Sequence, residues 1–316
     1  MTEIPVAEKA LRVLIAGFAA PFTCTQALLT LWDKHASKPS GKRVATAQGS
    51  LHVQVAGGGC PAVILEAGMG GTSLDWALVQ PEIARMATVI SYDRAGMGWS
   101  GRADGPATCG GYVRELRLLL KSLDVRPPYV LAGHSYGGMI MSLFAALYPE
   151  EVEGLLLVDA TPVSFYLPEG MSPVRRQQRK SNRRQARLGY LLSPTGLLRL
   201  LRRPLGARRL PKSLHKQAGA IRYRSGAYKT LYRELLQSEQ SARELQNAPM
   251  LSEALPVIVL SSGTRGGEWS KGQRSLAGLT ARTRQIVAED SPHSIQIHRP
   301  ELVIAAIKEL LLNSYS

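Results

Sequence analysis

The sequence predicts an α/β fold, in which a mostly parallel β-sheet carries helices on both faces. Short apolar runs typical of buried strands alternate along the chain with segments of helical spacing. A glycine-flanked serine stands between one of these strands and the helix that follows it. The alternation stops once, at a long basic segment, and then resumes. We therefore expect one sheet-based core that is interrupted by an insertion.

The elements expected in the core are short and follow one another closely. Gly49-Ser50 separates two strand-like runs, which predicts an antiparallel hairpin at the start of the sheet. The later strands alternate with helices, as parallel pairing requires. The expected strands are residues 43–48, 51–56, 62–67, 88–92, 129–133, 155–158, 257–261 and 285–288, and the expected helices are residues 75–86, 112–123, 137–148 and 301–312.

Composition restricts the chemistry that the chain can use. Its 316 residues suffice for one large domain with an insertion, or for two small domains. Cys24, Cys60 and Cys109 are too few for a disulfide framework in a chain of this length. No Cys-x-x-Cys motif or histidine-rich cluster indicates a metal site. We expect the protein to need no disulfide, metal ion or other cofactor.

The formal net charge of +15 is concentrated in one internal segment. Residues 161–250 contain 19 Lys or Arg and 4 Glu, so the rest of the chain is neutral overall. A large positive charge favours anionic partners. No recognition motif or aromatic stacking platform accompanies it, so we do not expect a nucleic acid. The segment is either a solvated basic surface or a surface that rests on anionic lipid.

Residues 13–32 form an uncharged stretch that is long enough, as a helix, to cross the hydrocarbon layer of a membrane. The stretch predicts a single N-terminal membrane anchor and hence a membrane location. A cleaved signal peptide and the packing helix of a soluble protein are the alternatives. Basic residues lie on both sides of the stretch, so the side of the membrane that the remainder occupies stays open. The polar residues 33–42 are typical of a linker.

Gly133-His134-Ser135-Tyr136-Gly137 is the motif that indicates chemistry. It follows a strand-like run and opens a helical stretch. Small flanking residues let the chain turn sharply from strand to helix, which leaves the serine hydroxyl exposed. The pattern predicts Ser135 as a nucleophile and the backbone amide of Tyr136 as a donor to an oxyanion.

With these motifs in order, the sequence resembles the serine-hydrolase (esterase- and lipase-like) branch of the α/β-hydrolase family. The resemblance covers residues 43–160 and 255–313. The motifs that carry it are EAGMGG at 66–71, YDRAGMGWS at 92–100, the serine motif, SPH at 291–293 and RPE at 299–301.

The resemblance implies roles for further residues. His293 corresponds to the general base, with His298 as its competitor, and the Met69 amide corresponds to the second oxyanion donor. The basic segment stands where this family inserts a helical cap over the active site. The implied division is an anchor and linker at 1–42, a core at 43–160 and 251–316, and a cap at 161–250.

The acid of the triad is where the sequence departs from the family pattern. Many members carry an aspartate shortly after the seventh strand, but residues 262–268 read SGTRGGE. Asp159, at the end of the preceding strand, is the first choice because a strand end holds it in place. Glu268 and an unidentified third group are the alternatives. We interpret Asp93-Arg94 as structural.

These expectations amount to a membrane-associated serine hydrolase that cleaves a small carboxylic ester or related acyl compound through an acyl-enzyme. A serine nucleophile argues against epoxide hydrolases and dehalogenases of this fold, which use a carboxylate. Amidase, thioesterase and peroxidase-like activities remain alternatives. A catalytically silent binding module with the same fold is the alternative from outside the enzymes.

Overall fold

The computed structural model describes residues 3–37, 39–47, 49–169, 171–205 and 210–313. Its strands are β1 Lys42–Thr46, β2 Gly49–Ala56, β3 Ala62–Glu66, β4 Val89–Tyr92, β5 Tyr129–His134, β6 Val152–Val158, β7 Val257–Ser262 and β8 Thr283–Ala288. Within the described residues they form one eight-stranded sheet in the order β1-β2-β4-β3-β5-β6-β7-β8. β2 is antiparallel to β1 and β4, and the other neighbours are parallel. The predicted hairpin and mostly parallel sheet are confirmed, but Gly49 and Ser50, expected to separate the two strands, are paired within β2. Gln48 lies outside the described residues.

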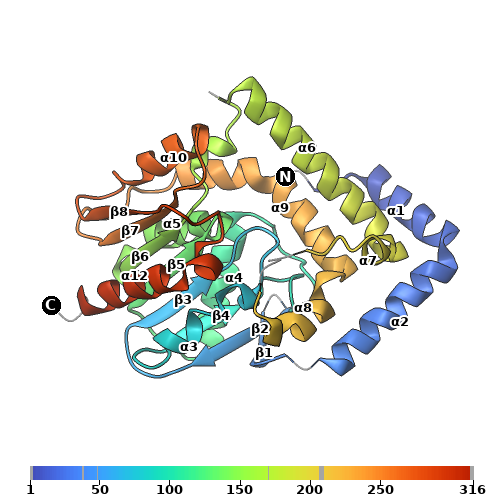
Figure 1. Cartoon of the computed structure of the whole chain (residues 1–316), viewed down its shortest axis with the longest axis horizontal. Coiled ribbons are helices and arrows are strands. Elements are labelled where there is room, and N and C mark those ends of the chain that lie inside the picture. The colour runs from blue at the N-terminus through green and yellow to red at the C-terminus, as the bar shows by residue number, and fades with distance from the viewer. Residues whose placement is uncertain (1–2, 38, 48, 170, 206–209, 314–316) are drawn as a thin grey trace.

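Helices cover both faces of the sheet (Figure 1). The helices of the core are α3 Gln80–Ile83, α4 Cys109–Ser122, α5 Tyr136–Leu147, α10 Glu268–Leu276, α11 Ile295–His298 and α12 Pro300–Asn313. Alternate strand residues point to opposite faces. Thus Leu131 of β5 joins the apolar cluster with α4 and α5, while its neighbours Val130 and Ala132 join the cluster with α3 and α12. This alternation produces the two apolar layers that hold the sheet.

The helix expected at residues 75–86 forms only in part. The chain makes a 3₁₀ turn at Ser73–Trp76 and then the short helix α3. Pro81 lies in the first turn of α3, where its missing N–H is tolerated. A helix running through Pro81 from residue 75 would lose a hydrogen bond and crowd a carbonyl of the preceding turn.

The segment between β6 and β7 is helical, as the expected insertion requires. It contains α6 Pro173–Leu192, α7 Leu197–Leu200, α8 His215–Arg222 and α9 Ser225–Gln246. α9 packs against α4 and α5 of the core, and α6 packs along α9 (Figure 1). The exact division at residues 42, 160 and 250 stays a prediction.

The N-terminal apolar stretch forms two helices instead of the single helix predicted over residues 13–32, so that prediction is wrong. α1 Val6–Phe18 and α2 Ala20–Ala36 meet at an angle of 95°. Pro21 explains the break, because in a continuous helix its ring would crowd the carbonyl of Gly17. α2 also extends into the expected linker, of which Lys38 lies outside the described residues.

Across the described ranges, no helix taken singly combines the length and hydropathy needed for a bilayer crossing. Only the bent pair α1–α2 reaches both, and only when its two helices are counted together.

Candidate active site

Ser135 occupies a sharp turn between β5 and α5. Its φ of +54° lies in the left-handed region, which costs a residue other than glycine about 1–3 kcal/mol. The turn also brings two backbones into close contact, since a Cβ atom on Gly137 would lie 2.6 Å from the carbonyl oxygen of Ala67. The motif therefore folds as predicted, and the strained backbone presents the serine hydroxyl at the carboxyl end of the sheet.

The structure brings the three residues predicted as a triad into contact. The Ser135 Oγ lies 2.9 Å from His293 Nε2, and His293 Nδ1 lies 2.6 Å from Asp159 Oδ2. His293 lies in the loop between β8 and α11, and Asp159 directly follows β6. With the Nδ1 proton directed to Asp159, the free Nε2 lone pair accepts the serine hydroxyl hydrogen bond.

Asp159 is held as a carboxylate by donors from the end of β7 and from α10. The Ser262 backbone amide and the Trp269 indole both donate to Asp159 Oδ1, at 3.0 and 2.8 Å. Burial alone would raise the pKa of Asp159, but the hydrogen bond and charge of His293, with these two donors, hold that pKa below its usual range. Asp159 is therefore ionised at neutral pH.

Glu268, the alternative acid, begins α10 with an exposed side chain and makes no hydrogen bond to His293. β7 and α10 thus supply donors to a carboxylate that follows β6, and the loop between β7 and α10 supplies no carboxylate of its own. Sequence reasoning missed Trp269 in this role, although an indole N–H directly after a loop without aspartate was a usable signal.

The other histidines near the site lack the geometry of a base. His298 ends α11 and makes no hydrogen bond to Ser135 or Asp159. His134 Nε2 lies 3.0 Å from the backbone oxygen of His293 and supports that loop. Burial, assisted by the nearby His293, lowers the pKa of His134 to about 3, so its imidazole is neutral.

The two backbone amides predicted as oxyanion donors flank the serine. The loop with Met69 follows β3 and lies against the turn, since a Cβ atom on Gly68 would be 3.2 Å from the Ser135 Cβ. Neither the Met69 nor the Tyr136 amide donates a hydrogen bond inside the described chain. Both N–H groups are therefore free to bind an oxygen beside Ser135.

A buried ion cluster beneath this loop holds it in place. Arg94 donates to the carbonyl oxygens of Ala67 and Gly68, both at 2.7 Å. It also pairs with Glu66 at 2.5 Å and with Glu234 of α9 at 3.0 Å. Burial lowers the pKa of Arg94, but Glu234 and Glu66 outweigh this and raise it above its usual range. The interpretation of Asp93-Arg94 as structural agrees with these contacts.

Glu234 connects the inserted helices to the oxyanion loop. Its Oε2 accepts the Gly70 amide at 3.1 Å while its Oε1 binds Arg94 and the Tyr112 hydroxyl. Sequence reasoning missed this residue. The signal in the sequence was that acidic residues are rare in this segment, since only 4 occur between residues 161 and 250.

Arg265 is a further residue that sequence reasoning missed. Its Nη1 lies 2.9 Å from His293 Nδ1 and 3.5 Å from Asp159 Oδ2. The guanidinium carbon lies 3.6 Å from the centroid of the Trp269 ring. Because Nδ1 can carry only one hydrogen bond, which goes to Asp159, Arg265 acts on the carboxylate. Its position as the single cation of residues 262–268 was the signal in the sequence.

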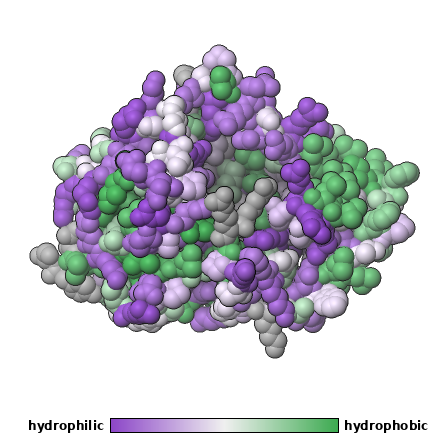
Figure 2. Space-filling view, in the orientation of Figure 1, coloured by the Kyte–Doolittle hydropathy of each residue, from purple (hydrophilic) through white to green (hydrophobic). Residues whose placement is uncertain are grey.

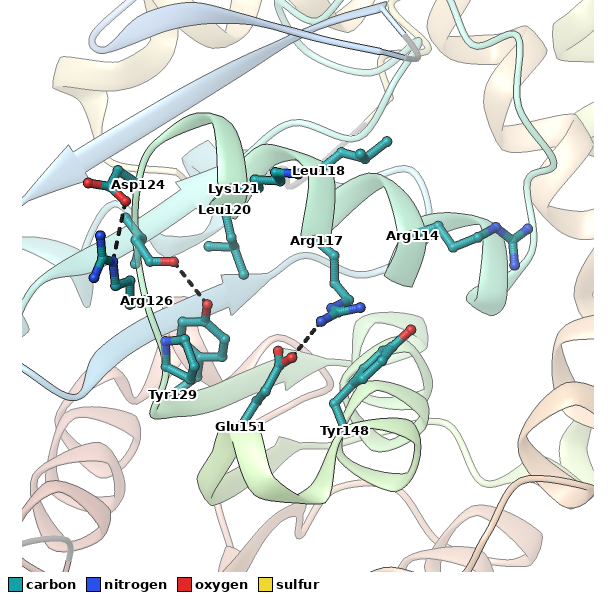
Figure 3. Close-up of a pocket in the computed structure, with 12 residues that line it drawn as sticks. Arg114, Arg117, Leu118, Leu120, Lys121, Asp124, Arg126, Tyr129, Tyr148 and Glu151 are labelled. Carbon is teal, nitrogen blue, oxygen red and sulfur yellow. Dashed lines mark hydrogen bonds and ion pairs between the residues drawn. The ribbon is translucent and has the colours of Figure 1, made fainter.

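A cavity of about 630 Å³ lies at the opposite end of β5 from Ser135 (Figure 3). It is next to Tyr129, which begins this strand. Arg117 in its wall pairs with Glu151 at 2.5 Å, and Arg126 pairs with Asp124 at 3.5 Å (Figure 3). This cavity is separate from the candidate active site, and salt bridges neutralise two of the cations in its wall.

Comparisons with known proteins identify the family and the fold. A profile of the alpha/beta hydrolase family matches residues 63–306. An uncharacterized protein of Bacillus subtilis, YqjL, is 27% identical over 254 residues, which are 78% of this chain and 82% of that protein. Two solved structures share the fold at lower identity. Epoxide hydrolase CorEH has a TM-score of 0.71 at 17% identity, covering 86% of this chain and 98% of its own.

The second is a thermophilic esterase from Thermogutta terrifontis, with a TM-score of 0.62 at 22% identity, covering 88% of this chain and all of its own. At these identities the two likenesses show the fold alone. The family profile spans more than half of the chain. This protein therefore belongs to the alpha/beta hydrolase family.

Proposed function

We propose that the protein is a serine hydrolase that cleaves a carboxylic ester or a related acyl compound through an acyl-enzyme intermediate. The observation that carries this proposal is the hydrogen-bonded series from Ser135 through His293 to Asp159, with distances of 2.9 and 2.6 Å. A hydroxyl is a weak nucleophile unless a base stands beside it, and a base keeps its tautomer only when a third group orients it.

The reaction follows from these contacts. Ser135 Oγ attacks the acyl carbon while His293 Nε2 takes the hydroxyl proton, and Asp159 stabilises the resulting imidazolium. The Met69 and Tyr136 amides bind the oxyanion. His293 then returns the proton to the leaving alcohol, and water, activated by the same imidazole, releases the acid and restores Ser135.

The first test is covalent labelling of the purified protein. A fluorophosphonate probe is expected to modify one residue, because only an activated serine displaces its leaving group at a useful rate. Peptide mass spectrometry should place the adduct on Ser135. A series of p-nitrophenyl esters of graded chain length then measures which acyl group raises kcat/KM. Heat-denatured protein is the control and should stay unlabelled.

The labelling experiment also separates the alternatives. A folded protein that takes up no probe and hydrolyses no ester would contradict the proposal and favour a silent binding module. Labelling at Ser135 without ester turnover would contradict the ester as substrate and direct the search to amides and thioesters.

We also propose that the protein lies on an anionic membrane surface through α1, α2 and α7. Phe18, Leu200 and Phe22 keep 97%, 78% and 70% of their surface exposed. They line a groove of about 870 Å³ together with Leu14 and Leu29. Figure 2 shows this area as a hydrophobic region over the α1–α2 pair, at the right of the view. Exposed apolar surfaces of this extent are typical of interaction sites.

The chemistry around the groove favours a lipid bilayer as the occupant. Arg202 and Arg203 follow α7 with exposed side chains, whereas Arg199, which lines the groove, is paired with Asp33 at 2.7 Å. An apolar area bordered by arginines matches the boundary between acyl chains and anionic headgroups. The bend between α1 and α2 favours helices that lie in the plane of the interface, each with its apolar side inserted.

Substituting three of these apolar residues tests the proposal. The variant Phe18→Ser/Phe22→Ser/Leu200→Ser is expected to lower partitioning onto phosphatidylglycerol vesicles by more than about 10²-fold, because each side chain contributes roughly 1.5–3 kcal/mol when buried. Vesicle flotation measures the bound fraction. The matched control is Met86→Ser/Met250→Ser/Val287→Ser, which removes exposed apolar residues elsewhere.

Equal flotation of both triple variants and the wild type would contradict the membrane proposal. So would a concentration-dependent dimer that only the groove variant abolishes, because a second copy of the chain would then cover the groove.

A further inference from the structure

A second surface of the α1–α2 pair faces the core across a cavity of about 590 Å³. Of the described residues that line this cavity, six are cationic and none is acidic. They come from both helices, the edge strand, the loop after β4 and the start of α9. We call this space the cationic cavity. The six cations are Arg12, Lys34, Arg43, Arg102, Arg224 and Lys229.

Within the described chain, none of these six cations forms a salt bridge with a carboxylate. Arg43 donates to the Ser50 hydroxyl at 2.7 Å, and Arg12 and Arg224 donate to neutral oxygens. Lys34, Arg102 and Lys229 make no hydrogen bond there. The cavity of Figure 3 differs in this respect, because Arg117 and Arg126 in its wall are paired with Glu151 and Asp124.

The cations of this cavity repel one another. Burial lowers the pKa of Lys34, and the charges of Arg224 and Arg43 lower it further. Burial and the charges of Arg233, Arg102 and Arg12 do the same to the pKa of Lys229. Two carboxylates act on the cluster without pairing with it, Asp93 on Arg224 and Asp104 on Lys229. The free protein therefore carries an uncompensated positive charge here.

We propose that the cationic cavity binds a ligand that carries a phosphate group. A phosphate monoester brings about two negative charges and three acceptor oxygens, whereas a carboxylate brings one charge and two oxygens. Arginine forks match phosphate oxygens in pairs, and lysines add point charges. Six convergent cations thus fit a phosphate better than any singly charged anion.

Two sources supply this chemistry, a soluble phosphate monoester and the monoester headgroup of phosphatidic acid in a membrane. The second source gains support because α1 and α2, which carry Arg12 and Lys34, also carry the exposed apolar surface. That source rests on the proposed membrane association. Binding itself rests on neither the membrane nor the acyl chemistry of Ser135.

The decisive variant is Lys34→Gln/Lys229→Gln in the full-length protein. Since neither lysine makes a hydrogen bond or ion pair in the described structure, the variant should fold, and its Tm without ligand should equal or exceed that of the wild type. Inorganic phosphate and glycerol 3-phosphate, at constant ionic strength against chloride, should raise the Tm of the wild type by a few degrees. Calorimetry should show affinity about 10²-fold weaker in the variant, because two charge-assisted contacts are lost.

Arg126→Gln is the matched control, because it removes a surface cation from the other cavity and should leave phosphate binding unchanged. The proposal would be overturned if the double variant and the wild type bound phosphate with equal affinity. It would also be overturned if the wild type did not respond to phosphate and its vesicle binding did not depend on Lys34 and Lys229.

Vesicle flotation distinguishes the two sources. A dependence of binding to phosphatidic acid vesicles on Lys34 and Lys229 identifies a headgroup, and a response to soluble phosphate alone identifies a soluble ester. Repeating the measurements with Ser135→Ala separates this site from the hydrolase, since binding should not change when turnover is lost.

Discussion

Replacing Ser135 with alanine is expected to lower kcat for the best p-nitrophenyl ester about 10⁶-fold. The Oγ is the atom that forms the acyl-enzyme, and the 2.9 Å contact with His293 Nε2 is the route by which it loses its proton. The remaining activity is direct attack of water on the acyl carbon, which the Met69 and Tyr136 amides still accelerate by binding the oxyanion that forms. Steady-state kinetics with active-site titration measures the change.

His293→Ala should cause a loss of similar size, and the double variant should be no slower than either single one. The two side chains act as a unit, so removing the second removes nothing further. Ser142→Ala is the control, since it deletes another largely buried hydroxyl from α5 and should keep near-normal activity. Additive losses in the double variant would contradict the assigned roles.

Replacing Asp159 with asparagine is expected to lower kcat about 10⁴-fold. The contacts of the carboxylate specify how the amide would sit. Because Ser262 and Trp269 both donate to Oδ1, the amide oxygen would take that place. The amide NH₂ would then face His293 Nδ1 and force the proton onto Nε2, where it prevents acceptance of the Ser135 proton. Rates of turnover and of fluorophosphonate labelling should fall together.

Glu268→Gln makes the same chemical change on an exposed carboxylate and should leave kcat within a few-fold of the wild type. Glu268→Gln should melt at the wild-type temperature, whereas Asp159→Asn should melt below it but remain folded, because the depressed pKa of Asp159 means that its ionised form stabilises the fold. Loss of turnover in Glu268→Gln with normal turnover in Asp159→Asn would reverse the assignment of the acid.

The predicted elements that agree with the structure are those whose signal is local. The uninterrupted apolar runs at residues 62–67 and 129–133 predict buried strands. The structure confirms them, because each of these strands has a neighbouring strand on both sides in the sheet. The helix expected at 75–86 forms only from residue 80, because Pro81 is tolerated in the first turn of a helix and not in its interior. Pro21 divides residues 13–32 into two helices for the same reason, and both prolines are visible in the sequence.

The contacts between distant segments could not be predicted in this way. Asp159 and Trp269 are 110 residues apart in the chain, and Arg94 and Glu234 are 140 apart. Whether a charged residue is paired, exposed or directed at a base depends on which loops meet. Composition located the positive charge in the segment 161–250, but only the fold places Arg224 and Lys229 of that segment opposite Arg12, Lys34 and Arg43.

The sequence by itself therefore determined the fold class, the nucleophile turn at Ser135 and His293 as the base, because each depends on periodicity or on a short motif. The tertiary structure decided which carboxylate meets His293. It does so because β5, β6 and β7 are neighbours in the sheet, so their carboxyl ends bring Ser135, Asp159 and the Ser262 amide together. Adjacency of strands is a property of the whole sheet, and no local stretch of the chain encodes it.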